Sequence, residues 1–225
     1  DLGKLNKDVR NLLAMFDTDC GRDQVRERTA HFLKQLQANA ARKNRGGKYK
    51  YPRTAEDKLF EPSYRHKHRD SPTCICRDCH RRYDPIRDCH TRYDPVCDEA
   101  LNSSCDGLGC DERYLVVRER LETKQQLERD KSDEAQEPAI YAGIVATADT
   151  VMKSGEDRDR IAMQEGAIAF EMEGAGVWEE VPCIVVKGVC DYADCHKNKK
   201  WQDFAAATAA SASKAILERY IRIDK

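Results

Sequence analysis

Four carboxylates follow two apolar runs late in the sequence, and their types and placement suit a ligand-binding site with acid–base chemistry. Glu171 and Glu173 follow the first run, and Asp191 and Asp194 follow the second. Clustered carboxylates can stabilise a developing positive charge, accept hydrogen bonds from hydroxyl groups, or transfer protons where burial shifts a pKa. A structural interpretation stands beside this one, since acidic residues favour first helical turns and loops. Periodicity alone leaves both interpretations open.

The segments that carry these carboxylates alternate between strand and helix patterns. We expect strands at 139–146, 167–171 and 183–189, short helices at 157–164 and 174–180, and a long helix over 201–221. This order is typical of an α/β fold with parallel strands. Open α/β sheets bind ligands at the carboxyl ends of their strands. If 167–171 and 183–189 belong to one βαβ unit, all four carboxylates lie at that edge.

The remainder of the chain divides into two segments. Residues 1–41 predict two helices, because apolar residues recur at helical spacing, and we assign them to the same domain. Residues 42–137 hold a basic loop, a Cys/His-rich stretch and a charged linker, so we expect a long, partly irregular insertion. Residues 138–225 then form the α/β part.

Seven of the eleven cysteines crowd between Cys74 and Cys110, around a ten-residue tandem copy at 77–86 and 87–96. An odd, crowded set does not fit a secreted disulfide framework, and we expect a cytoplasmic protein. Thiolates and imidazoles bind tetrahedral zinc. The candidate zinc ligands are Cys74, Cys76, Cys79, His80, Cys89 and His90. One Cys-x2-Cys pair has the right spacing but no second pair follows, so a loop with free thiols is the alternative.

Charge and hydropathy argue against two other classes of partner. The net charge is −1, and no apolar run approaches the ~20 residues of a membrane helix, so we expect no membrane association. Residues 42–53 carry six basic side chains with two interleaved tyrosines, a pattern that can bind nucleic acid. Because Gly46, Gly47 and Pro52 interrupt regular structure, we favour an ordinary surface loop and expect no nucleic acid.

The run FEMEGAG (170–176) followed by CIVVKGVCDYADCHKNKKW (183–201) resembles the purine and uridine phosphorylase superfamily of nucleoside phosphorylases and nucleosidases. The resemblance is greatest to the branch found in fungal NACHT-, ankyrin- and TPR-type signalling proteins. Met172 and Glu173 match a Met-Glu signature, and residues 190–194 match a Ser/Cys-Asp-x-Ala-Asp signature. The strong match spans about residues 139–221.

This resemblance implies roles for individual residues. Glu173 would bind the ribose 2′- and 3′-hydroxyls, Met172 would pack on the ribose, and Asp191 would protonate the purine at N7. Further substrate-binding positions are Glu171, Asp194, Val151, Thr147 and Lys187. Val151 stands where related nucleosidases place a wall for the base. Thr147 and Lys187 replace a Ser and an Arg of the branch, and Lys cannot reproduce a bidentate Arg fork.

The resemblance also implies a function and an architecture. We expect a partial phosphorylase-type sheet that cleaves the N-glycosidic bond of a purine nucleoside or nucleotide, with water or phosphate as co-substrate and no other cofactor. The family's Gly-rich phosphate loop is absent from residues 1–60, so we expect the C-terminal half of the domain. Its partners would be the other domains of a larger signalling protein and further copies in a homo-oligomer. The alternative is a catalytically inactive interaction module with a structural metal site.

Overall fold

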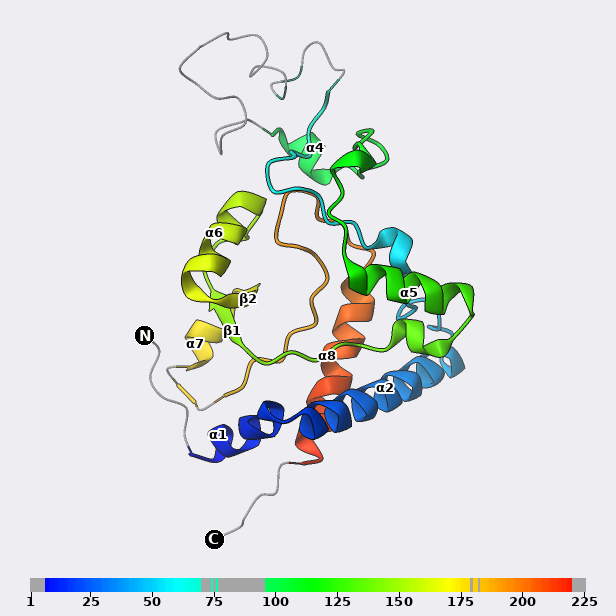
Figure 1. Cartoon of the computed structure of the whole chain (residues 1–225), viewed down its shortest axis with the longest axis vertical. Helices are drawn as coiled ribbons and strands as arrows, with labels where there is room; N and C mark the ends of the chain where they lie inside the picture. The colour runs from blue at the N-terminus through cyan, green and yellow to red at the C-terminus, as the bar shows by residue number, and fades with distance from the viewer. Residues whose placement is uncertain are drawn as a thin grey trace.

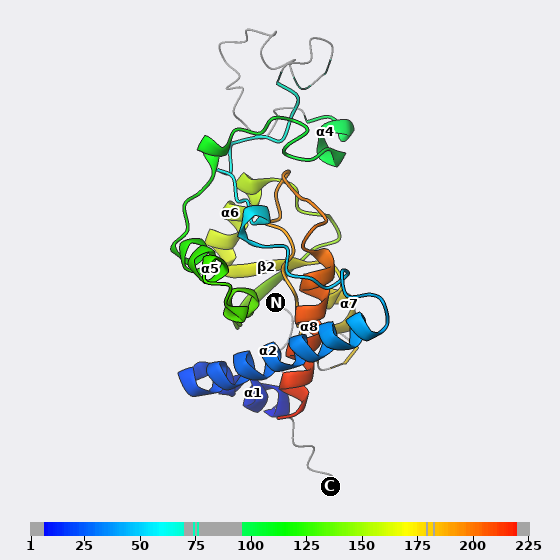
Figure 2. The same cartoon turned by 90° about the vertical axis from the view of Figure 1, so that its right-hand side faces the viewer.

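The fold is described from a computed structural model, for residues 7–69, 74, 76, 96–178, 180–181 and 183–219. Two long helices from opposite ends of the chain cross each other, α2 (Asp19–Arg42) and α8 (Gln202–Leu217) (Figures 1 and 2). A short helix α1 (Lys7–Leu13) and a 3-10 turn (Ala14–Asp17) lead into α2. The predicted N-terminal helices are therefore present, and they pack on the C-terminal helix.

Local sequence explains why α2 and α8 form and why they meet. Thr18 caps α2, since its hydroxyl accepts the Gly21 amide at 3.1 Å. The small residues of α8 allow its backbone to approach α2 closely. The buried residues of this α2–α8 core are Phe16, Val25, Phe32, Leu33, Phe204, Ala207 and Ala215.

A parallel two-stranded sheet, β1 (Ile144–Thr147) and β2 (Ala167–Glu171), lies beside helix α6 (Gly155–Glu165), which connects the strands. Ser154 caps the start of α6 through the Asp157 amide at 3.1 Å. Gly166 ends it at φ 65°, a left-handed conformation that glycine adopts without strain. The α/β class and the parallel pairing predicted from the sequence are confirmed, as a β1–α6–β2 unit.

The predicted third strand at 183–189 is wrong. Residues 183–190 run as extended chain, without strand pairing among the described residues. Instead this segment passes against α8, where a Cβ on Gly188 would lie 2.0 Å from the Ala205 carbonyl oxygen. A β-branched apolar run can be buried against a helix as well as in a sheet, so composition alone did not decide between them. The predicted strand at 139–146 is likewise shorter, beginning at Ile144.

Between α2 and the sheet the chain forms short elements joined by loops, as expected for a partly irregular insertion. These are α4 (Asp98–Asn102), α5 (Glu119–Arg129), and 3-10 turns at Thr54–Glu56, Glu112–Tyr114 and Asp133–Gln136. After the sheet, β2 is followed by the short helix α7 (Gly174–Trp178). Phe60 pairs with Leu115 in a single antiparallel bridge. The Phe60 ring stacks on the His196 ring, with the ring centroids 4.2 Å apart. This contact links the segment between α2 and the sheet to the C-terminal part of the chain.

Candidate functional site

The carboxyl ends of the two strands bring Thr147 and Glu171 together as partners in the sheet register. Glu171 is 9% exposed, and its Oε2 accepts the backbone amides of Glu173 at 2.7 Å and Gly174 at 2.6 Å. Burial alone would raise the pKa of Glu171, but the nearby Thr147 hydroxyl, the two amides and the Lys187 ammonium together lower it. Glu171 is thus an ionised anchor for the turn that begins α7.

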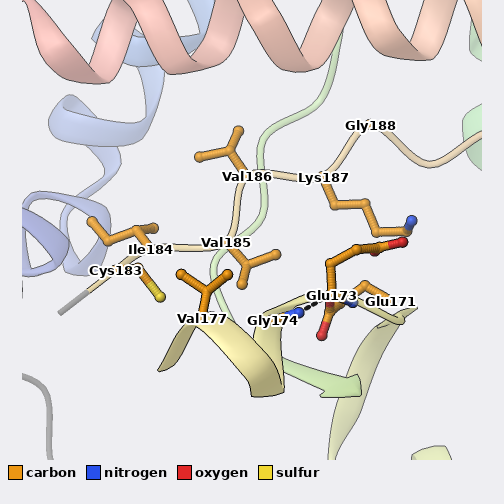
Figure 3. Close-up of a pocket in the computed structure, with 10 residues that line it drawn as sticks. All are labelled: Glu171, Glu173, Gly174, Val177, Cys183, Ile184, Val185, Val186, Lys187 and Gly188. Atoms are coloured by element: carbon orange, nitrogen blue, oxygen red, sulfur yellow. Dashed lines mark hydrogen bonds between the residues drawn. The ribbon is translucent and has the colours of Figure 1, made fainter. Parts of the chain in front are cut away.

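That turn presents Met172 and Glu173 to solvent. Met172 is 44% exposed, and Glu173 Oε2 accepts its amide at 3.2 Å. Glu173 and Glu171 lie on one side of a pocket of about 400 Å³, and the extended segment 183–188 forms the other side (Figure 3). The Lys187 side chain extends toward the two glutamates. The structure therefore brings together three residues that the sequence singled out.

Thr147 adds a polar group to this end of the sheet. Its hydroxyl oxygen is buried beside the Glu171 carboxylate, whose pKa it helps to lower, but makes no hydrogen bond of regular geometry within the part of the chain that the structure describes. Val151 lies in the loop that connects β1 to α6, and 44% of its surface is exposed. A hydroxyl has one hydrogen to donate and two lone pairs, so Thr147 retains capacity for contact with a bound molecule.

Asp191 and Asp194 lie in the loop before α8, and they do not line the pocket beside Glu173. Asp191 Oδ1 accepts the Ala193 amide at 2.9 Å and lies 3.3 Å from Lys197 Nζ. Asp194 is 5% exposed, and its Oδ1 accepts the His196 amide at 2.9 Å. Burial raises the pKa of Asp194, although His196 and Arg158 oppose the rise.

The loop between these two aspartates is fastened by Tyr192. The Tyr192 hydroxyl donates to Asp57 Oδ1 at 2.6 Å, and Arg118 contacts both groups. Burial and the Asp57 carboxylate raise the pKa of Tyr192 to about 12. Arg158 Nη1 donates to the Tyr192 carbonyl at 2.9 Å and lies 3.7 Å from Asp194 Oδ2. No local sequence signal marked Arg118 or Arg158, because both lie far along the chain from Tyr192.

Two groups of thiols and imidazoles gather close to this loop. One consists of His66, Cys105, Cys110 and His196, and the other consists of His68, Cys74, Cys76 and Cys97. Of the predicted zinc ligands, Cys74 and Cys76 belong to the second group. Cys79, His80, Cys89 and His90 lie outside the described residues. The three histidines of the groups were missed, because each is far in sequence from some of its cysteine partners.

No helix in the described part of the chain combines the length and the hydropathy that a membrane span requires.

Comparison with known proteins finds similarity along the second half of the chain. The phosphorylase superfamily matches residues 96–222. A nucleotide-binding leucine-rich repeat (NLR)-like protein of Hyaloscypha variabilis is 38% identical over 112 residues, which are 50% of this chain and 10% of that protein. A 5′-methylthioadenosine/S-adenosylhomocysteine nucleosidase of Mycobacterium bovis is 28% identical over 86 residues, 36% of this chain and 34% of the enzyme. The chain thus spans about a tenth and a third of these relatives. No solved structure matches.

Proposed function

Because the chain belongs to the phosphorylase superfamily, we propose that it supplies the sugar- and base-binding part of a domain that cleaves the N-glycosidic bond of a purine nucleoside or nucleotide. The observation that carries the proposal is the anchoring of Glu171 by two backbone amides, because the anchored turn holds Glu173 in the lining of a pocket, with Met172 next to it in the chain. The mycobacterial relative bears the name of a nucleosidase, which supports this reaction class.

Each proposed role follows from the chemistry of the side chain. The Glu173 carboxylate accepts hydrogen bonds from the ribose 2′- and 3′-hydroxyls, and its charge stabilises the oxocarbenium-like sugar as the bond to the base breaks. Met172 packs against the ribose, and Val151 forms a wall for the base. The Thr147 hydroxyl, buried beside Glu171, donates a hydrogen bond to the bound substrate or accepts one from it.

The departing base takes the electron pair of the glycosidic bond, so it needs a proton. We assign this proton to Asp191, which delivers it to N7 of the purine. An oxygen of water or phosphate forms the new bond to the sugar C1′, and the proton that this nucleophile loses restores the acid. Lys187 lines the same pocket, and its positive charge attracts the phosphate of a co-substrate or of a nucleotide.

The test is release of free base from adenosine, inosine and ATP, with and without phosphate, by the 225-residue chain and by the natural full-length protein. Asp191→Asn should lower the rate of the active form by about 10²- to 10⁴-fold, since it removes the proton donor. Asp203→Asn, an exposed change in the first turn of α8, is the matched control and should keep the parental rate. The proposal fails if the full-length protein releases no base.

A second candidate function is a catalytically inactive interaction module within a larger signalling protein. The ion pair between Lys197 Nζ and Asp191 Oδ1, which are 3.3 Å apart, favours this alternative. It engages the carboxyl group that is proposed as the proton donor. The similarity to one tenth of an NLR-like protein supports attachment to other domains, and further copies of the chain could assemble around them. Base release that Asp191→Asn abolishes would reject this alternative.

A further inference from the structure

The strongest unassigned feature of the molecule is the pair of Cys/His groups. We call His66, Cys105, Cys110 and His196 the inner cluster, and His68, Cys74, Cys76 and Cys97 the outer cluster. Within each cluster one ligand atom from every residue lies within 4.8 Å of the others. From this convergence we propose that the chain binds two structural zinc ions, one in each cluster.

The hydrogen bonds of the inner histidines point both rings at a common centre. His66 Nε2 lies 3.0 Å from the Ser103 carbonyl oxygen, and His196 Nε2 lies 2.8 Å from the Tyr64 carbonyl oxygen. A carbonyl oxygen can only accept, so each Nε2 carries a hydrogen, and Nδ1 is the nitrogen of each ring that is left to bind a metal. The same arrangement orients metal-ligating histidines, whose second nitrogen donates to a carbonyl or carboxylate.

The two Nδ1 atoms of these rings face each other at a separation of 3.2 Å. Two lone pairs at this distance repel unless a proton or a cation lies between them. Both rings are buried, with 1% of His66 and 6% of His196 exposed, so water does not relieve the repulsion. A metal cation at the centre satisfies both nitrogens and both thiols at once.

The separations in the inner cluster match tetrahedral zinc. With Zn–N near 2.0–2.1 Å and Zn–S near 2.3 Å, tetrahedral angles place two nitrogens about 3.3 Å apart and a nitrogen about 3.6 Å from a sulfur. Cys105 Sγ lies 3.8 Å from His66 Nδ1 and 3.7 Å from His196 Nδ1. The corresponding distances from Cys110 Sγ are 3.4 Å and 4.0 Å. Each distance lies within about half an ångström of the zinc value.

The outer cluster has the composition of a Cys3His site. His68 Nδ1 lies 3.4 Å from Cys74 Sγ, 3.5 Å from Cys97 Sγ and 4.0 Å from Cys76 Sγ. Backbone amides donate to two of the sulfurs, from Cys97 to Cys76 at 3.3 Å and from Ala100 to Cys97 at 3.4 Å. Such donors stabilise thiolates, the form that binds metal.

The ligand chemistry selects zinc and a structural role. Sites made of thiolates and imidazoles without a carboxylate favour zinc over magnesium or calcium, and four protein ligands leave no open position for a substrate. His66 and His68 are separated by one residue, so this short segment gives one histidine to each of the two clusters. In Figure 1 the ligand-bearing segments converge next to α4.

The inner zinc connects the insertion to the loop of the proposed acid. His196 belongs to this site, and its backbone amide donates to Asp194 Oδ1 at 2.9 Å. The same ring stacks on Phe60. The ion therefore fixes the residues just after Asp191 from a position outside the pocket.

The experiment is metal analysis of the 225-residue chain, purified under reducing conditions from cells supplied with zinc. Two zinc ions per chain are expected. Cys110→Ser should remove the inner ion and Cys97→Ser the outer one, each leaving about one. Cys20→Ser, an exposed cysteine of α2 outside both clusters, is the matched control and should retain two.

A second measurement covers variants that fail to fold. Cobalt titrated into the chelated parent protein should produce the intense visible bands of tetrahedral thiolate coordination, saturating at two equivalents. Folded parent protein with less than about 0.2 zinc per chain and no such bands would overturn the proposal. A disulfide between the cysteines of a cluster, seen as a protein mass lower by two hydrogens and without bound zinc, would overturn the proposal for that cluster.

Discussion

Glu171 shows how one buried carboxylate can place two exposed residues. Its ionised oxygen accepts the amides of Glu173 and Gly174, and a Cβ on Gly174 would lie 2.6 Å from Glu171 Oε1. The turn after β2 therefore fits closely around this carboxylate. Because Glu173 is held through its own amide and Met172 lies between the two glutamates in the chain, the positions of both residues depend on Glu171.

Glu171→Gln keeps the shape of the side chain and removes its charge. At pH 7 we expect the free energy of unfolding to fall by on the order of 1 kcal/mol, since hydrogen bonds to a charged acceptor are the stronger kind. A folded-state pKa below the unfolded value of about 4.3 means that this stabilisation is complete above that value and is lost as pH falls through the folded pKa.

Urea unfolding at several pH values measures the difference between parent and variant. It should stay constant from pH 7 to about 5 and shrink below about pH 4. Glu165→Gln, an exposed change at the end of α6, should show no such difference. A parent–variant gap that persists undiminished at pH 3 would contradict the assignment of an ionised anchor.

Single residues were predictable where the signal is local and not where it is distant. Glu171, Glu173 and Lys187 were named from the sequence, and they meet at one pocket. Cys74 and Cys76 were named as metal ligands on their residue types and join the outer cluster. His66 and His196 stand 130 positions apart, so no spacing rule connects them.

At the scale of elements, the segment 183–190 illustrates the limit of pattern reasoning. The β1–α6–β2 unit could be predicted, because a cap at Ser154 and a stop at Gly166 delimit the helix between two apolar runs. The third apolar run, residues 183–189, has the composition of a strand but lies against α8. Strand formation needs a hydrogen-bonding neighbour, and the sequence does not state which edge is available.

Gly188→Ala tests this close packing. The added Cβ would lie 2.0 Å from the Ala205 carbonyl oxygen, so α8 or the extended segment must move. We expect a loss of about 1–3 kcal/mol in the free energy of unfolding. Gly176→Ala is the matched control, since a Cβ there meets nothing within 4 Å and Ala favours helix α7. Equal stabilities of the two variants would disprove the contact.

At the scale of the whole molecule, the family match does not include every segment that packs with the matched part. The match covers 96–222, yet α2, at 19–42, forms the main helical core with α8. Residues 1–41 were assigned to the same domain from their apolar stripes alone, and that assignment stays a prediction. The stripes indicate that a partner exists but not that it is the C-terminal helix.

Leu33→Ala measures what this core contributes. Leu33 is 1% exposed between α2 and α8, so truncation should cost about 2–5 kcal/mol of unfolding free energy. Leu217→Ala, 67% exposed at the end of α8, should cost less than about 0.5 kcal/mol. Denaturant unfolding followed by circular dichroism compares them. A small loss for Leu33→Ala would show that α2 and α8 are not packed in solution.

The order of the proposed zinc ligands along the chain has a consequence for biosynthesis. The outer ligands run along the chain from His68 to Cys97. They therefore fall between the first inner ligand, His66, and the second, Cys105. A ribosome therefore delivers a complete outer cluster long before residue 196 emerges. The inner cluster must wait for His196, with three of its four ligands already made. Metal loading would thus proceed from the outer ion to the inner one, and the loop of Asp191 would be fixed last.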